Sequence, residues 1–539
     1  MLGRPRTGVG AKLNRMIDRV IIAAAAAACI LLAAPPQAAA ADAARDALAR
    51  HAAYVGHATD IVSTYRFVPA AKASPSPAPS AESSPEPDFG PTEQTTYRKG
   101  LLYHEVDRAE GVSTESGFDG RTYWASNENR YTVTLYEDAQ RRAITSNVID
   151  ADTFDELTDV QLRNPQTIDG VQYDVVRVTP RGGITADLAI DRTTGAFGQI
   201  TYQPDERYGR TVVRILSYTE IAPGVRVPAS YRYGRDATVT LLRAAARPVT
   251  DAEMQRPAAP SAVWAFGNGD PVRFDIERGT WVGRAIIVHA SINGKPGTFL
   301  FDSGASQVLL YRPYADGLGL AMLGKTAFSG VNGGSRSARF ARAASITIGD
   351  NTLSNVILAI SSRDPGQKGT IDGILGFDVL AGALVHVDLV KETMEFADPA
   401  QSAATVPKGA YAFPVNLSDL TPEVQIKVGS VATRATFDTG DDYSVILSDN
   451  LTKTGKVIGL VDSTMFFGGV DGIANEPASC YILREITVGP YRYQNSLTCF
   501  GSERVFGRDG GLIGFDFLRH FNWTFDYSRS RLILTPNGR

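Results

Sequence analysis

Two aspartates of this chain stand in nearly identical surroundings, which makes them the first candidates for chemistry. Asp302 lies in the sequence Phe-Asp-Ser-Gly at 301–304, and Asp438 lies in Phe-Asp-Thr-Gly at 437–440. Two carboxyl groups held about 3 Å apart cannot both ionise at low cost, so they share one proton. The charged member then acts as a general base on water, while the protonated member polarises a carbonyl group. The residue types therefore favour hydrolysis without a metal or a covalent intermediate.

Two further elements recur behind the triplets at nearly the same spacing. The segment 374–380 (Ile-Leu-Gly-Phe-Asp-Val-Leu) matches 512–518 (Leu-Ile-Gly-Phe-Asp-Phe-Leu), and 387–389 matches 525–527. The offset is 136 residues between the aspartates (438 − 302) and 138 between the glycines of the second element (514 − 376). Ordered elements that recur at one offset indicate an internal duplication.

The duplication predicts two like lobes, at 271–400 and 408–539, that pack about a pseudo-twofold axis and each place one aspartate on it. Each aspartate must stand at a sharp turn after a buried strand, where only glycine has the required backbone freedom. The hydroxyl that precedes each glycine is able to form hydrogen bonds across the lobe interface. Four residues are therefore predicted to support the dyad: Ser303, Gly304, Thr439 and Gly440.

The region 271–539 resembles the aspartic peptidases, specifically the bacterial retropepsin-like branch with two lobes fused in one chain as in pepsin. The resemblance implies a mainly β fold with a pair of β-barrel lobes. It implies an aspartic endopeptidase that hydrolyses peptide or protein substrates through an Asp302/Asp438 dyad, with no metal and no cofactor. Because a fused two-lobe chain completes its own dyad, we expect a monomer.

Glycine-rich segments lie between the two signature elements of each half, at 329–334 and 467–472. They resemble the flap hairpins that close over substrate in this family, and the alternative is an ordinary hairpin tip. The flap candidates are Gly330, Val331, Gly469 and Val470.

The second triplet departs from the family pattern in the residues that follow it. Ala305-Ser306 follows the first triplet, whereas Asp441-Asp442 follows the second. A further carboxylate three residues from Asp438 either raises the pKa of the dyad or points to solvent.

The first 41 residues are predicted to be a secretory signal peptide. Arginines and a lysine precede the apolar run 20–34, and prolines and alanines follow it. A charged start, an apolar middle and a small-residue exit are typical of such signals. We therefore expect a chain secreted across the inner membrane, in the periplasm. The alternative is an uncleaved anchor, although the apolar run is shorter than the roughly 20 residues of a spanning helix.

Cys480 and Cys499 are placed symmetrically about a predicted hairpin turn at Gly489-Pro490. Residues placed in this way face each other across a hairpin. In an oxidising compartment they are candidates for a disulfide, and the alternative is a pair of buried thiols.

The region 42–250 is predicted to be a separate domain made of a helix over 42–66 and an antiparallel series of short strands. It carries an Ala/Ser/Pro-rich insert at 71–91 that is predicted to be disordered. The strand and turn pattern resembles the half-barrel of periplasmic lipoprotein carriers, which implies an apolar ligand. A Pro- and Gly-containing linker at 251–270 follows, so we expect this domain to fold independently and to perform no chemistry.

Other functional classes lack the residues they need. The net charge is −4 and no long basic stretch occurs, which argues against nucleic-acid binding. The chain has no His-Glu-x-x-His metal motif and no Gly-x-Ser-x-Gly nucleophile turn. The remaining rival is a non-catalytic periplasmic binding or scaffold protein that keeps the aspartic-peptidase fold.

Overall fold

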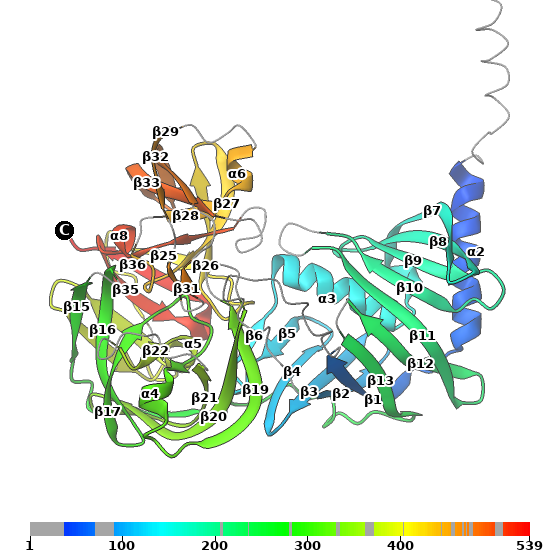
Figure 1. The fold of residues 1–539 in the computed structure, drawn as a ribbon, viewed down its shortest axis with the longest axis horizontal. Helices are drawn as coiled ribbons and strands as arrows, with labels where there is room; N and C mark the ends of the chain where they lie inside the picture. The colour runs from blue at the N-terminus through cyan, green and yellow to red at the C-terminus, as the bar shows by residue number, and fades with distance from the viewer. Residues whose placement is uncertain are drawn as a thin grey trace, which may run out of the picture.

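The computed structural model describes residues 37–538, except 70–90, 205–208, 235–236, 280–282, 330–334, 362–370, 403, 443–444, 454–458, 466–467, 470–471, 474–477 and 502–509. The chain is mainly β, which confirms the predicted fold class. An N-terminal sheet with two helices lies beside two β lobes formed by the C-terminal half, as Figure 1 shows.

The N-terminal part is one strongly extended antiparallel sheet of 13 described strands. Its order is β6-β5-β4-β3-β2-β1-β13-β12-β11-β10-β9-β8-β7. Strands consecutive in sequence pair, except β6 and β7 at the two edges, and β1 also pairs with β13. The strands are β1 (Asp60–Pro69), β2 (Thr92–Lys99), β3 (Leu102–Ala109), β4 (Val112–Phe118), β5 (Tyr123–Ser126), β6 (Thr132–Thr134), β7 (Leu157–Ile168), β8 (Val171–Pro180), β9 (Ala186–Asp191), β10 (Phe197–Tyr202), β11 (Thr211–Ala222), β12 (Val225–Tyr233) and β13 (Ala237–Ala246).

Two helices cover this sheet, α2 (Gln37–Val55) and α3 (Glu137–Asp150). A single-turn helix, η1 (Phe154–Glu156), follows α3. The prediction of a helix as far as residue 66 is wrong, because α2 ends at Val55 and β1 begins at Asp60. Gly56 adopts a positive φ of 73°, which ends the helix in a conformation that glycine accepts readily.

The first lobe is built on a mixed sheet that contains the first triplet. Its elements are β14 (Val263–Ala265), β15 (Val272–Gly279), β16 (Gly283–Ile292), β17 (Lys295–Phe301), β18 (Leu309–Leu310), α4 (Arg312–Ala315), β19 (Ala321–Ser329), β20 (Ser335–Ile348), β21 (Asn351–Ser361), β22 (Gly373–Leu375), α5 (Phe377–Ala381), β23 (Leu384–Asp388) and β24 (Thr393–Ala397). The predicted linker contributes β14, which pairs with β21.

The second lobe repeats this plan. Its elements are β25 (Tyr411–Pro414), β26 (Glu423–Val428), β27 (Val431–Phe437), β28 (Val445–Ser448), α6 (Asn450–Lys453), β29 (Gly459–Met465), β30 (Gly468–Gly469), β31 (Gly472–Ile473), β32 (Ala478–Val488), β33 (Tyr491–Gly501), β34 (Gly511–Ile513), α8 (Phe515–Leu518), β35 (Phe521–Asp526), η2 (Tyr527–Arg529) and β36 (Arg531–Pro536). Strand β26 shows why the sequence folds this way, since Val424, Ile426 and Val428 alternate inward.

The lobes are joined by one continuous sheet whose register reveals the pseudo-twofold axis. Strands β23 and β35 pair antiparallel, with His386 opposite Thr524. These two residues are 138 positions apart, which is the offset of the sequence repeat. Equivalent residues face each other at one point of an antiparallel pair only when a twofold axis passes between them. A hydrogen bond of 2.9 Å between His386 Nδ1 and Thr524 Oγ1 marks that point.

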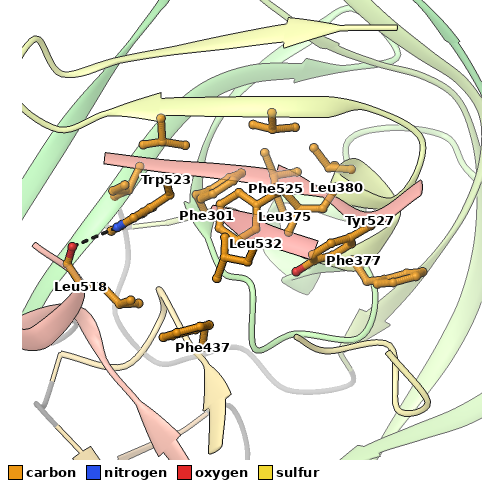
Figure 2. Packing of buried hydrophobic residues seen from close by; sticks show 14 of the residues in the cluster. Phe301, Leu375, Phe377, Leu380, Phe437, Leu518, Trp523, Phe525, Tyr527 and Leu532 are labelled. Carbon is orange, nitrogen blue, oxygen red and sulfur yellow. Dashed lines mark hydrogen bonds between the residues drawn. The ribbon is translucent and has the colours of Figure 1, made fainter. Parts of the chain in front are cut away.

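The large apolar core extends through both lobes and around this sheet. Figure 2 shows Phe301 and Phe525 with aromatic and leucine side chains from both lobes. The indole of Trp523 donates a hydrogen bond of 2.9 Å to the carbonyl of Leu518. Phe301 and Phe437, which precede the two triplets, are both 1% exposed. The aspartates therefore emerge from one shared core rather than from two separate ones.

The N-terminal part also packs into this core, which weighs against the expectation of independent folding. Tyr131 and Val133, on either side of the start of β6, belong to the same apolar cluster as the lobes. Val112 of β4 packs against Phe340 and Ile357 of the first lobe. Removal of residues 42–250 would therefore expose apolar surface of the lobes.

Cys480 and Cys499 form a disulfide across the hairpin of β32 and β33. They lie directly opposite each other in the strand register, and both are buried.

The predicted signal peptide is outside the described residues up to position 36, and α2 begins at Gln37. No helix within the described ranges is long and apolar enough to cross a membrane.

We predict that replacing both cysteines by serine (C480S/C499S) lowers the stability of the second lobe by at most about 3 kcal/mol, the value for a bridge that closes a short loop. The strand pairing on either side of the bridge remains, so the fold should persist. Urea unfolding of the oxidised wild type and of the variant measures the difference, and reductant should affect only the wild type. Two alkylatable thiols in the unreduced native protein would contradict the assignment.

Candidate active site

Each triplet begins where a buried strand ends beside a parallel partner. Asp302 follows β17, which pairs parallel with β22, and Asp438 follows β27, which pairs parallel with β34. The amide of Asp302 donates to Leu375 O at 3.0 Å, and the amide of Asp438 donates to Ile513 O at 2.9 Å. The second signature element therefore fixes the backbone of the first in both lobes.

The hydroxyl groups of Ser303 and Thr439 hold the two turns together. Ser303 Oγ donates to the carbonyl of Phe437 at 2.6 Å and accepts from the amide of Thr439 at 3.1 Å. Thr439 Oγ1 donates to the carbonyl of Phe301 at 2.8 Å and accepts from the amide of Ser303 at 3.0 Å. Both side chains are 1% exposed, so these four bonds are shielded from water. Each triplet therefore makes the same two kinds of hydrogen bond to the other, as the twofold repeat requires.

The structure brings the carboxyl groups of Asp302 and Asp438 into a hydrogen bond with each other. Each carboxylate reaches across to the glycine of the opposite triplet. A Cβ atom added to Gly304 would collide with the carboxyl group of Asp438, and one added to Gly440 would collide with that of Asp302. Glycine is therefore required at both positions by close approach of the two halves.

The glycine amides also orient the carboxyl groups. Gly304 N donates to Asp302 Oδ1 at 2.8 Å, and Gly440 N donates to Asp438 Oδ1 at 2.9 Å. Asp438 is 8% exposed, whereas Asp302 is more accessible. The pair is thus held rigidly at its base and open on the side of Asp302.

Burial raises the pKa of both aspartates, and the two groups do not respond equally. Desolvation, then the charge of Asp438 and the hydrogen bond to it, place the pKa of Asp302 well above its ordinary value. Desolvation also raises the pKa of Asp438, but the hydrogen bond from Asp302 and the amides of Gly440 and Asp441 oppose that rise. The two carboxyl groups therefore share one proton and titrate as a pair.

Asp441 and Asp442, which follow the second triplet, have different surroundings. The amide of Phe515 donates to the carbonyl of Asp441, just as the amide of Phe377 donates to that of Ala305. Desolvation raises the pKa of Asp442, and the charge of Asp516 adds to the rise while Arg284 opposes it.

Asp378 of α5 is the point at which the N-terminal part contacts the first lobe behind the dyad. Its Oδ1 accepts from Asn127 Nδ2 at 2.8 Å and from Asn129 Nδ2 at 2.9 Å. Its Oδ2 accepts from the amide of Val308 at 3.0 Å. Desolvation raises the pKa of Asp378 to about 6, although these bonds oppose the rise. Asn129 also exchanges two hydrogen bonds of 2.7 Å with the backbone of Ile357.

Arg434 of β27 is the corresponding contact on the second lobe, four residues before Asp438. Its guanidinium donates to Glu137 Oε2 at 2.5 Å and to Asp138 Oδ2 at 3.1 Å. Glu423, on the neighbouring strand, lies 3.7 Å from the same group. Asp138 is 2% exposed. We call the segment 127–138 the clamp, because it binds both lobes close to the strands that carry the dyad.

The flap candidates fall mostly outside the described residues. Gly330, Val331 and Val470 are not described, while Gly469 lies in β30 and pairs with Gly472 of β31. In the described ranges no group of three or more His, Cys, Asp or Glu side chains is placed to hold a metal ion.

Comparisons with known proteins support the class of the first lobe. The sequence profile of the family described as "Aspartyl protease" matches residues 288–379, which include Asp302 and end before the second triplet. No curated protein matches the chain. The crystal structure of a DUF1329 family protein from Desulfovibrio piger ATCC 29098 aligns over 40% of this chain and 97% of its own, with 12% identity and a TM-score of 0.31. A likeness of that extent supports no inference about this chain.

Sequence reasoning missed the clamp. Asn127 and Asp378 are 251 residues apart, and no repeat or spacing connects them. Asp378 belongs to the repeated segment 374–380, but nothing in that segment indicates a partner in the N-terminal part. The one local signal is the polar run Asn127–Arg130, which lies between the buried aromatic side chains of β5 and the buried Tyr131.

We predict that Thr439→Val destabilises the lobe interface by about 3 kcal/mol, because it leaves the buried Phe301 carbonyl and Ser303 amide without partners. Thr439→Ser keeps the oxygen and is the matched control. Urea unfolding measures both. Equal stability of the two variants would show that the cross-lobe hydrogen bonds contribute nothing.

We predict that Asn129→Ala destabilises the protein by about 2 kcal/mol or more, since it leaves buried groups of Asp378 and Ile357 with fewer partners. Asn164→Ala, at an exposed position of β7, is the control and should change little. Thermal unfolding compares them. If N129A unfolds at the temperature of N164A, the clamp does not stabilise the first lobe.

Proposed function

We propose that this protein is an aspartic endopeptidase whose Asp302/Asp438 dyad activates a water molecule for hydrolysis of peptide bonds. The observation that carries the proposal is the reciprocal geometry of the two triplets. Their carboxyl groups are hydrogen-bonded to each other, and the hydroxyls of Ser303 and Thr439 lock the turns beneath them. The family match over the first lobe supports the same class.

The two aspartates take different roles in this mechanism. The charged member of the pair serves as the general base that removes a proton from the attacking water. The protonated member donates a hydrogen bond to the oxygen of the scissile carbonyl. As the tetrahedral intermediate collapses, a proton passes to the leaving amine. Neither step needs a covalent bond between protein and substrate.

The substrate is a peptide or protein segment in the compartment that the N-terminal signal indicates, the periplasm. The dyad is completed within one chain, so a monomer is sufficient for activity. Ser303, Gly304, Thr439 and Gly440 act on the dyad by position and hydrogen bonding. The glycine-rich tips around Gly330-Val331 and Gly469-Val470 are proposed to close over the substrate.

We predict that Asp302→Asn and Asp438→Asn each abolish cleavage of a peptide library by the mature protein. The double variant should be little worse than either single, because the two carboxyls work as a unit. Asp316→Asn, at an exposed position of the first lobe, is the control and should retain the wild-type rate. A statine peptide should block the wild type. Wild-type rates in either dyad variant would contradict the mechanism.

The pH dependence of the same assay is a separate prediction. The active dyad holds one proton, and the pKa of Asp302 is raised well above its ordinary value. Activity should therefore persist above the ordinary pKa of an aspartate and fall as pH rises through the raised pKa, when that proton is lost. It should also fall at low pH, when the dyad takes up a second proton. No cleavage at any pH, with the fold intact, would favour the non-catalytic scaffold.

A further inference from the structure

A second concave site lies in the N-terminal part, away from the dyad. It is a cavity of about 550 Å³ between the concave face of the sheet and the helices α2 and α3. That volume is within the range of small-molecule sites, roughly 300–1,000 Å³. Strands β1, β2 and β3 line it on one side, and β10, β11 and β12 on the other. Figure 1 shows α3 lying beside these strands.

Part of the cavity wall is aromatic. Tyr65 and Phe67 of β1 contact Tyr231 of β12 edge to face, with ring centroids 5.7 and 6.3 Å apart. Tyr218 of β11 and Phe197 of β10 extend this surface. Such a wall suits an apolar or aromatic ligand body, and aromatic faces also attract cations.

The opposite part of the wall is acidic. Glu105 of β3 lines the cavity and accepts a single hydrogen bond, from Thr96 Oγ1 at 3.2 Å. Among the described residues no cation lies within ion-pair distance of Glu105. Asp150, at the end of α3, also lines the cavity with its side chain 56% exposed. Asp150 has a counter-charge, since Arg98 Nη2 lies 3.9 Å from its carboxyl group.

The other cations that line the cavity are already paired. Arg142 donates to the carbonyl of Gly209 at 2.8 Å. Arg226 donates to the carbonyl of Tyr54 at 2.7 Å and to Glu220 at 3.1 Å. His51 Nε2 lies 3.3 Å from Asp152. Among the described carboxylates that line the cavity, Glu105 is therefore the one without an ion pair.

We infer that this cavity binds a cationic amphiphile, a ligand with an apolar or aromatic body and one ammonium group that pairs with Glu105. The aromatic wall takes the body, and Asp150 adds negative charge at the end where the ammonium lies. The sequence predicted an apolar ligand for this domain, and the carboxylates specify the charge of its head group. This inference is independent of the proposed peptidase activity.

The test uses the full chain and three ten-carbon probes below their micelle concentrations: decyltrimethylammonium, decanol and decanoate. Isothermal calorimetry at about pH 9, where Glu105 is ionised, should detect binding of the ammonium probe, weaker binding of decanol and the weakest binding of decanoate. Glu105→Gln should weaken binding of the ammonium probe about tenfold, which is the usual contribution of one charge-assisted interaction. Decanol binding should stay unchanged. Asp169→Asn, at an exposed turn, is the matched control and should leave the affinities of all three probes unchanged.

Two results would overturn the inference. One is decanoate binding as tightly as the ammonium probe, and the other is equal affinity of E105Q and the wild type for the ammonium probe. If E105Q does not fold, Asp150→Asn serves instead. The order of the affinities of the three probes for the wild type then still tests the inference.

The same probe gives a pH test, because its charge is permanent. Desolvation, Asp107 and Asp150 raise the pKa of Glu105 to about 8, while Thr96 and Arg98 oppose the rise. Tyr103 and Tyr231 also face this carboxyl group. The probe binds the ionised carboxylate, so its affinity should rise between about pH 6 and pH 9 in the wild type, and E105Q should flatten the rise. Affinity that falls over this range in the wild type would contradict the assignment.

Discussion

The C-terminal half depends on keeping two buried carboxyl groups against each other across a boundary between lobes. Desolvation and mutual repulsion oppose such a pair, so the surrounding structure must hold it. The hydroxyls of Ser303 and Thr439 do this with four buried hydrogen bonds, each to the backbone of the other lobe. The sheet formed by β23 and β35 adds a continuous frame below them. Relative movement of the lobes would break these bonds together, which is why the dyad is rigid at its base.

The clamp, a segment of the N-terminal part, also holds the two lobes in position. One short segment binds Asp378 behind the first aspartate and Arg434 before the second. Both contacts are buried and involve charged groups, so removing one partner leaves a charge without compensation, which is costly. The N-terminal part therefore supports the position of both lobes, and it also contains a cavity with its own chemistry. Support of the lobes and the proposed binding of a ligand are separate properties of one domain.

Sequence reasoning succeeded where the signal was local or repeated. The two triplets are four-residue patterns at a fixed offset, and a duplicated fold must bring equivalent positions to its axis. The cysteine pair followed from the symmetry of one hairpin. The predicted end of the first helix was wrong, because Gly56, with its positive φ, ends α2 after Val55. The contact of Asn127 with Asp378 and the missing counter-charge of Glu105 depend on tertiary packing, so no spacing in the sequence encodes them. The flap candidates lie mostly outside the described residues and stay a prediction.

The central claim is that Asp302 and Asp438 form one proton-sharing catalytic unit. The most direct measurement is calorimetric binding of a statine peptide, which mimics the tetrahedral intermediate, to the full mature chain and to D302N and D438N. The account predicts binding to the wild type, with its affinity declining as pH rises and the shared proton is lost. It also predicts a large loss of affinity in both variants. Equal binding to the wild type and to the variants, or no binding to a folded wild type at any pH, would contradict it.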